Sequence, residues 1–179
     1  MRPARPDSYR RLGVGAIALL TVLALVGGGY WWTHPQALSH GAEIGGELAV
    51  GETQVFDIAD HLAGYDETSR VLRIEPHIVR DETAARYEFV TCVLKDADDG
   101  IGATDEGDIP RLCASTRPTA GASFGLQDGR RSQLLMKLTA TKPGRLEIDG
   151  ADVTYRRSGR HLFQTGTQQS GTVMKLTAK

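Results

Sequence analysis

The sequence predicts a mainly β protein in which one N-terminal transmembrane helix is followed by an antiparallel β-sandwich. An uncharged apolar stretch runs from Leu12 to Trp32. After it, short segments of alternating apolar and polar residues recur at roughly 8–14-residue spacing, separated by Gly, Pro and Asp turn signals. No convincing amphipathic helix interrupts them. The roughly 145 residues after the stretch suffice for one domain with its own core.

The apolar stretch has the length of a membrane span. A helix rises about 1.5 Å per residue, so residues 12–32 reach roughly 31 Å, close to the ~30 Å hydrocarbon core of a bilayer. A helix also satisfies its own backbone hydrogen bonds in lipid. Tyr30, Trp31 and Trp32 end the stretch with amphipathic rings that favour the headgroup region. We therefore expect a transmembrane helix with an aromatic membrane interface at its C-terminal end.

The flanking charges predict the orientation of the chain. The C-terminal flank out to Gly51 contains no Lys or Arg, whereas the N-terminal flank carries four arginines against one acid. The positive-inside rule then places residues 1–11 in the cytoplasm and, after a tether at 33–43, a domain at 44–179 outside the cytoplasm. The chain is thus expected to be a single-pass cell-membrane protein held in the lipid bilayer by a signal anchor. The positive-inside residues are Arg2, Arg5, Arg10 and Arg11.

A cleaved signal peptide is the main alternative to this anchor. Ala37-Leu38-Ser39 is a passable cleavage site. The apolar stretch is longer than the usual 7–15 residues of a signal peptide, and it ends in aromatic residues, so we favour the uncleaved anchor.

The alternating segments predict short strands. Residues 70–80 alternate with Leu72 and Ile74 on the apolar face, and Pro76 interrupts the pattern, so this strand lies at an edge or bulges there. Residues 86–95 are rich in aromatic and β-branched side chains and apolar on both faces, which favours the middle of a sheet. Further strands are expected at 48–50, 55–57, 133–141, 145–148, 153–157, 161–164 and 172–177.

One segment carries a family resemblance. Residues 138–157, LTATKPGRLEIDGADVTYRR, contain a Pro-Gly pair suited to a type II turn and a following Val-x-Tyr strand. This resembles the late-strand hairpin of extracytoplasmic immunoglobulin-like domains of bacteria. It also resembles uncharacterised single-pass membrane proteins of GC-rich Gram-positive bacteria. The resemblance implies an immunoglobulin-like sandwich outside the membrane and no catalytic residue. The Cys…Trp…Cys framework of immunoglobulin domains is absent.

The two cysteines predict a structural disulfide. Cys92 and Cys113 both follow the apolar stretch, which places them in an oxidising compartment. The segment between them is too polar to bury, and in the simplest model a bridge would stabilise the fold by about 3 kcal/mol. A redox pair would need a Cys-x-x-Cys spacing, and a zinc site would need two further ligands that the sequence does not place nearby.

The acidic loop 96–108 is the most suggestive candidate site. Its carboxylates could supply oxygen ligands for Ca²⁺. The order of an EF-hand is not met, because Gly100 occupies the third ligand position and the twelfth position carries no Glu. A solvated loop is therefore the favoured interpretation. The carboxylates are Asp96, Asp98, Asp99, Asp105, Glu106 and Asp108.

Histidines and basic residues give weaker candidates. The five histidines lack a metal-binding spacing, and only His77, directly after Pro76, invites inspection; the others are His34, His40, His61 and His161. A cluster of arginines could bind anionic polymers or headgroups, although a charged outer face is favoured; it comprises Arg130, Arg131, Arg156, Arg157 and Arg160.

The charge distribution is uneven along the chain. Residues 34–110 carry 17 acids and 5 bases, whereas residues 111–179 carry 12 bases and 4 acids. The two halves either face each other within one domain, which we favour, or form separate surfaces for partners.

The sequence contains no acid, base and nucleophile set, no phosphate-binding glycine loop and no evident cofactor site. We expect a non-enzymatic, membrane-anchored binding or assembly module with an envelope protein as its partner and no role for nucleic acid. The alternative is a ligand- or Ca²⁺-sensing domain that uses the acidic loop 96–108.

Overall fold

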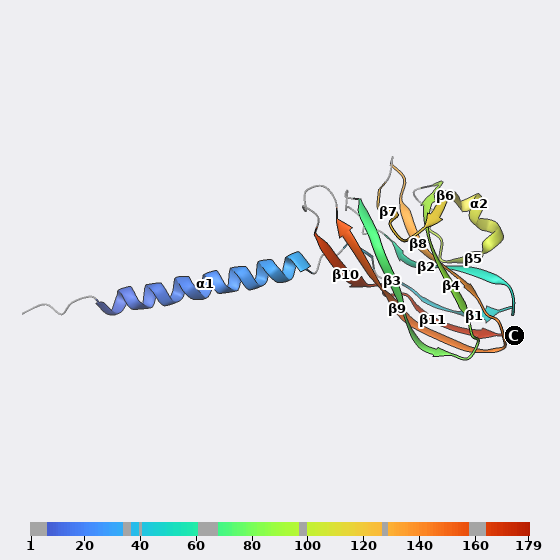
Figure 1. Ribbon diagram of the computed structural model, residues 1–179, viewed down its shortest axis with the longest axis horizontal. Helices are drawn as coiled ribbons and strands as arrows, with labels where there is room; N and C mark the ends of the chain where they lie inside the picture. The colour runs from blue at the N-terminus through green and yellow to red at the C-terminus, as the bar shows by residue number, and fades with distance from the viewer. Residues whose placement is uncertain are drawn as a thin grey trace, which may run out of the picture.

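A computed structural model describes the backbone of residues 7–33, 37–39, 41–60, 68–96, 100–126, 129–157 and 164–179. A single helix, α1 (Asp7–Thr33), projects from a β domain that contains all the strands (Figure 1). Within α1, side chains are described for residues 19–32. The arginines predicted to set the orientation, Arg2, Arg5, Arg10 and Arg11, lie outside the residues whose side chains are described.

Helix α1 corrects the prediction of a membrane span. In the described part of the chain, no helix is long and apolar enough to cross a membrane. The transmembrane helix predicted at 12–32 is therefore wrong. The described side chains of this helix, residues 19–32, include three consecutive glycines, 27–29, which are less apolar than the Leu, Val and Ala residues before them.

The domain is built from two sheets, as the mainly β prediction requires. The six-stranded sheet has the order β1 (Glu43–Leu48), β11 (Val173–Ala178), β9 (Gly144–Arg157), β3 (Ser69–Asp81) and β7 (Ser123–Phe124), with β10 (Thr165–Gln169) paired to β9. The five-stranded sheet has the order β5 (Ala103–Asp105), β2 (Thr53–Asp60), β8 (Ser132–Thr139), β4 (Arg86–Leu94) and β6 (Cys113–Pro118).

Alternation along the strands produces two cores. On β8, Leu134, Met136 and Leu138 point between the sheets, whereas Leu135 points to the opposite face. The larger set of buried side chains, called here the inner core, comprises Ala37, Leu38, Leu48, Phe56, Ile58, Ala59, Val71, Phe124, Leu134, Met136, Leu138, Ala140, Leu146, Ile148, Val153, Tyr155, Met174, Leu176 and Ala178. The smaller outer core comprises Val55, Val90, Cys92, Leu94, Ile101, Ile109, Cys113 and Leu135.

Strand β4 confirms the expectation of a central strand. It lies between β8 and β6 and contributes Val90, Cys92 and Leu94 to the outer core, while Phe89 packs against the inner core. Apolar side chains on both faces are therefore buried.

Strand pairing departs from a purely antiparallel sandwich. β1 runs parallel to β11, with Glu43 opposite Val173 and Leu48 opposite Ala178. The segment before β1 enters at the same end of the sheet at which β11 begins, so the first and last strands run in the same direction. The six-stranded sheet is mixed, and the antiparallel prediction is wrong at this edge.

The late strands are longer than the sequence pattern predicts. Residues 145–148 and 153–157 belong to one strand, β9, and not to two. Gly150 allows the chain to continue because its φ is +76°, and a Cβ there would lie 2.2 Å from the carbonyl oxygen of Ser170. The following strand is β10, whereas the strand expected at 161–164 lies almost wholly outside the described residues.

The two halves of the chain interleave in both sheets. β1 pairs with β11, β3 with β9, and both β2 and β4 with β8. Among the described residues, three ion pairs join an acid of the first half to a lysine of the second: Glu43–Lys175 (2.7 Å), Glu106–Lys137 (2.7 Å) and Glu47–Lys179. The uneven charge of the sequence is therefore partly neutralised within one domain.

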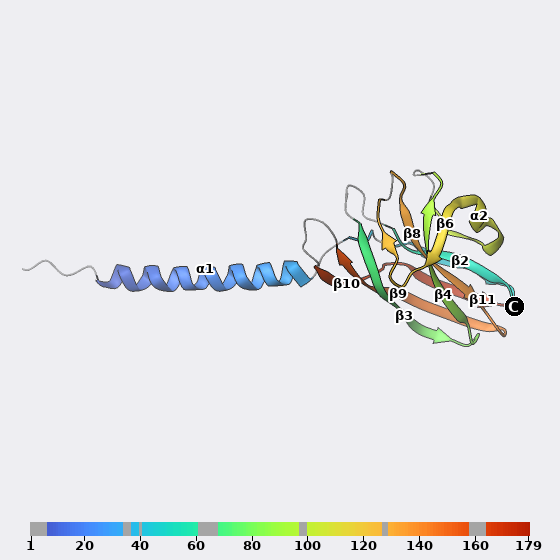
Figure 2. The same ribbon diagram turned by 45° about the horizontal axis from the view of Figure 1, so that its top comes forward.

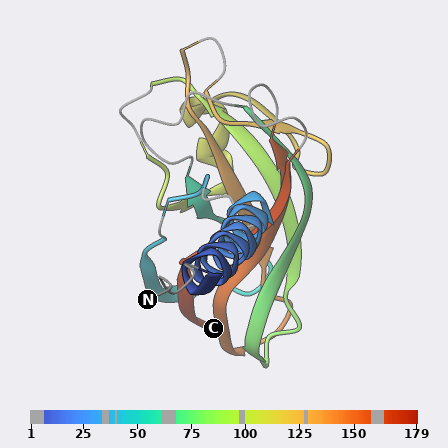
Figure 3. The ribbon, with the colours of Figure 1, turned by 90° about the vertical axis from the view of Figure 1, so that its left-hand side faces the viewer.

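The predicted tether is not a free linker. Ala37 and Leu38 are buried in the inner core, and the side chain of Gln168 on β10 fastens them. Its Oε1 accepts hydrogen bonds from the backbone N–H groups of Ala37 (2.9 Å) and Leu38 (3.1 Å), and its Nε2 donates to the Leu38 carbonyl (2.9 Å). Gln164 Nε2 likewise donates to the carbonyls of Trp31 (3.1 Å) and Trp32. α1 thus leaves the domain beside β10 (Figure 1), and Figure 3 views the helix end-on against the domain.

Candidate functional site

The predicted disulfide is confirmed. Cys92 on β4 and Cys113 at the start of β6 form a bond of 2.02 Å, with their Cα atoms 5.5 Å apart. Both cysteines are buried, and the bridge joins neighbouring strands of one sheet, as Leu94 faces Cys113 across the ladder. It therefore closes a local loop and does not connect the two sheets.

The segment enclosed by the disulfide folds over the outer face of the five-stranded sheet. Residues 100–113, called here the cover segment, form β5, a 3₁₀ turn (Glu106–Asp108) and the short helix α2 (Ile109–Leu112). Ile101, Ile109 and Cys113 supply its buried side chains to the outer core. Figure 2 shows α2 at the part of the domain away from α1.

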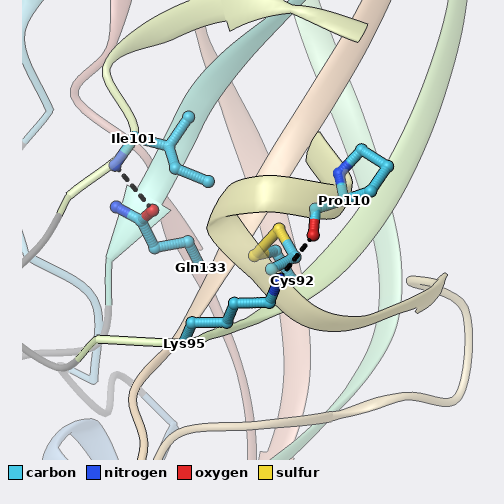
Figure 4. Close-up of a disulfide and its surroundings, with 6 residues drawn as sticks. Cys92, Lys95, Ile101, Pro110 and Gln133 are labelled. Carbon is cyan, nitrogen blue, oxygen red and sulfur yellow. Dashed lines mark hydrogen bonds between the residues drawn. A yellow bond between two sulfur atoms is a disulfide. The ribbon is translucent and has the colours of Figure 1, made fainter. Parts of the chain in front are cut away.

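Two hydrogen bonds near the disulfide hold the cover segment in place (Figure 4). Ile101 N–H donates to Gln133 Oε1 at 2.9 Å, and Gln133 is itself buried. Lys95 Nζ donates to the Pro110 carbonyl at 2.7 Å. The loop predicted at 96–108 is therefore folded at residues 103–108, which form β5 and the 3₁₀ turn, whereas the side chains of Asp105 and Glu106 are exposed to solvent, as the solvated interpretation expected.

The described acidic side chains of this region do not form a cluster of three, although Asp105 and Asp108 both line one small polar hollow. Glu106 pairs with Lys137, and Asp108 accepts from Thr104 at 3.3 Å and from Arg111 at 3.4 Å. Asp98 and Asp99 lie outside the described residues. Among the residues that are described, no group of three or more His, Cys, Asp or Glu side chains could hold a metal ion.

A buried carboxyl lies beneath the cover segment, and the sequence reading missed it. Asp57 on β2 donates its backbone N–H to the Gly102 carbonyl at 2.9 Å. Burial raises the pKa of Asp57 to about 8; the charge of Asp60 adds to the rise, and a hydrogen bond from the Ala59 backbone and then the charge of Arg131 oppose it. Asp57 Oδ1 and Arg131 Nε are both buried without a hydrogen-bond partner among the described residues. An acid inside an otherwise apolar strand, VFDIA, was the available signal.

A groove opens at the side of the sandwich where β3 and β6 lie. It measures about 330 Å³, and we call it the edge groove. It is mostly apolar and is lined by Val71, Leu72, Arg73, Ile74, Phe89, Pro118, Thr119 and Ala120. Its walls come from both sheets, because β3 belongs to one and β4 and β6 to the other.

The groove adjoins an open strand edge. β7 pairs with β3 only at Ser69 and Arg70, and Val71 bonds to residues 121 and 122. Beyond Val71, no described strand pairs with this edge of β3. Leu72, Ile78 and Val79 are 39%, 44% and 66% exposed along it. The expectation that this strand lies at an edge or bulges at Pro76 holds in both respects, since the register also shifts between Pro76 and Ile78.

The remaining candidates are dispersed. His77 Nε2 lies 3.1 Å from Asp152 Oδ2, and its Nδ1 lies 3.2 Å from Gln169 Nε2, on the outer face of the six-stranded sheet. His34, His40, His61 and His161 lie outside the described residues, as does Arg160. Arg157 is buried against Gln164, whereas Arg130 and Arg156 are exposed, so the expected arginine cluster is not one surface. Tyr30, Trp31 and Trp32 are exposed at the end of α1.

Comparisons with known proteins assign no family to this chain. No protein-family model matches it, and no curated protein does. A match among solved structures is described as "Structure of PbICP-C in complex with falcipain-2"; it has a TM-score of 0.23 and 13% identity, and covers 82% of this chain and 97% of that chain. A similarity at that TM-score carries no argument about fold or function. The immunoglobulin-like resemblance therefore stays a prediction.

Proposed function

We propose that this chain is a non-enzymatic binding or assembly module whose partner is another protein of the cell envelope. The edge groove is the observation that carries the proposal. It combines a mostly apolar hollow with an open strand edge, and protein partners use both features. The proposal concerns the β domain.

The proposed location is extracytoplasmic, at the cell membrane. The disulfide supports it, because such bonds persist outside the reducing cytoplasm. The lipid bilayer is proposed as a second partner on account of α1, whose described side chains are mostly apolar and all exposed; Leu20, Leu25 and Val26 are 66%, 71% and 64% exposed. This proposal concerns contact with lipid and does not require the helix to cross it. Flotation of the purified chain with liposomes tests it, and a chain that stays at the bottom of the gradient would contradict it.

Ca²⁺ sensing by the acidic region is the alternative. No described group of carboxylates favours it, since Glu106 and Asp108 already have cationic or hydroxyl partners. The full chain is expected to show the same melting temperature with millimolar Ca²⁺ and with a chelator. A Ca²⁺-dependent rise in melting temperature would revive the alternative.

In-cell cross-linking tests the assembly function. A photo-reactive amino acid is placed on several surfaces of the full chain, including Leu72 at the edge groove and Thr177 on the outer sheet face; both side chains are exposed. We expect a discrete protein adduct from at least one position, identified by mass spectrometry and lost when that partner is deleted. A chain that yields no partner-dependent adduct from any surface would overturn the assembly function.

A further inference from the structure

We propose that the edge groove binds an extended polypeptide segment of the partner, which adds as a short strand to β3 and carries apolar side chains flanked by carboxylates. This inference rests on the proposed binding function and specifies its surface and the chemistry of its partner. Three independent features of the described structure lead to it: the direction of backbone groups, the shape of the hollow, and the charge around it.

Backbone groups on the open side of β3 are already used for strand addition at one end. Val71 donates its N–H to the Ala122 carbonyl at 2.9 Å and accepts from the Gly121 N–H at 2.8 Å. Together with β7, this makes residues 121–124 a short strand-like partner of β3 that stops at the groove. A peptide in the same line would continue the pairing along residues 72–75.

Pro76 limits the length of the added strand. Proline has no N–H, so a ladder on this edge loses a donor at that residue. The register of β3 against β9 also shifts between Pro76 and Ile78 and again between Ile78 and Arg80. The segment that fits is therefore short, about four residues of pairing, and its affinity must come partly from its side chains.

The groove provides the site for those side chains. In a strand, alternate residues point to the same face, so an added strand would place every second side chain toward the hollow. Ile74 and Phe89, which also pack against the inner core, line it together with Pro118. A volume of about 330 Å³ lies at the small end of ligand pockets, which suits one or two aliphatic or aromatic side chains.

Positive charge surrounds the opening. Arg73 lines the groove and forms an ion pair with Glu75, its neighbour on the strand. Arg70 donates its Nε to the Gly121 carbonyl at 3.1 Å, and Arg117 precedes the lining residue Pro118 and is exposed. Neither Arg70 nor Arg117 forms an ion pair with a described acid. Carboxylates beside the apolar positions of the peptide would be attracted to this rim.

A second copy of the chain fits the same edge less well. Two β3 edges that pair would bring together two copies of the same rim, each with exposed Arg70, Arg73 and Arg117 and with Glu75 as its carboxylate on the strand. Like charges directly opposite each other destabilise a strand pair. The occupant is therefore a heterologous segment.

Synthetic peptides test the proposal on the full chain. The probe is a capped, fluorescent Glu-Val-Asp-Leu-Asp-Val-Glu peptide, and its counterpart replaces every acid with Lys. We expect saturable anisotropy changes with the acidic peptide, at least tenfold weaker binding of the lysine peptide, and slower amide exchange in residues 72–75 on binding. Equal binding of both peptides, or protection confined to another surface, would overturn the proposal.

Charge-reversal variants locate the site. Arg117→Glu is expected to weaken binding of the acidic peptide by roughly fivefold or more, whereas Lys142→Glu, the same charge change in an exposed turn, should leave it within about twofold. Both variants must retain the melting temperature of the parent chain. If neither peptide binds while in-cell cross-links arise from another surface, the binding function stands and this assignment of its site falls.

Discussion

The inner and outer cores bury side chains by different means. The inner core draws its members from both sheets and from the segment before β1, so many long-range contacts support each side chain. The outer core is much smaller, and one of its walls is the cover segment, which has only one turn of α-helix. The covalent link between Cys92 and Cys113 lies inside this smaller core. A small apolar cluster therefore relies on a cross-link where a large one relies on its own packing.

Truncation in the inner core should have the largest effect. Phe56 is 1% exposed and lies between the sheets. Phe56→Ala is expected to lower the free energy of unfolding by about 3–5 kcal/mol, because it removes buried apolar area and leaves a cavity. Chemical denaturation with a two-state fit measures this, and exchange should accelerate across both sheets. Val50→Ala, at a side chain that is 37% exposed, is the control and should change stability little.

Removal of the disulfide should have a smaller and more local effect. The Cys92→Ala, Cys113→Ala double variant is expected to lose about 3 kcal/mol, the simplest loop-entropy value for the closed segment. Amide exchange should accelerate first in residues 100–113. Uniform acceleration through β9 and β11 would contradict the distinction between the two cores.

Asp57 allows the outer core to be tested by pH. Its pKa is raised to about 8 in the folded chain, against an ordinary value near 3.8. The unfolded chain releases the proton first, so the native state is penalised progressively as pH rises from about 4 to 8. Asp57→Asn should therefore raise the melting temperature more at pH 8 than at pH 5, with a gain on the order of 1–3 kcal/mol. A gain independent of pH would count against a buried, protonated carboxyl.

The ion pair at the surface of the cover segment should matter least. Lys137 Nζ lies 2.7 Å from Glu106 Oε1, and the glutamate side chain is 50% exposed. Glu106→Gln is expected to lower the free energy of unfolding by about 0.2–1 kcal/mol. This loss should be smaller at high salt, because salt already screens the ion pair of the parent chain. Denaturation in low and high salt measures it, and a loss as large as that of the disulfide variant would show that the cover segment is held electrostatically.

The parts of the fold predicted from sequence are those with local signals. The apolar faces of β4 and the turn before β9 follow from side-chain alternation and from Pro143-Gly144. The disulfide pairing is confirmed. The oxidising compartment expected for the two cysteines was inferred from the predicted transmembrane helix, which the described structure does not contain. A disulfide between Cys92 and Cys113 closes a local loop whether or not a transmembrane helix precedes the domain.

The missed features depend on contacts between distant residues. The parallel pairing of β1 with β11 joins residues about 130 positions apart, and so do the hydrogen bonds that the backbone N–H groups of Ala37 and Leu38 donate to Gln168. No periodicity marks such pairs. The edge groove arises where β3 of one sheet approaches β4 and β6 of the other, so its lining residues share no sequence motif.

The parallel pairing of β1 and β11 has a mechanical consequence. If α1 is held at one end and a partner pulls at the C-terminal end, tension runs along both strands in opposite directions. The ladder from Glu43–Val173 to Leu48–Ala178 is then loaded in shear, so its hydrogen bonds must yield together and not one after another. Single-molecule pulling between the two termini should show a higher rupture force than pulling between Glu43 and Val173, which lie opposite each other at the same end of the ladder. The domain would thus resist extension along the line that joins its helix to its last strand.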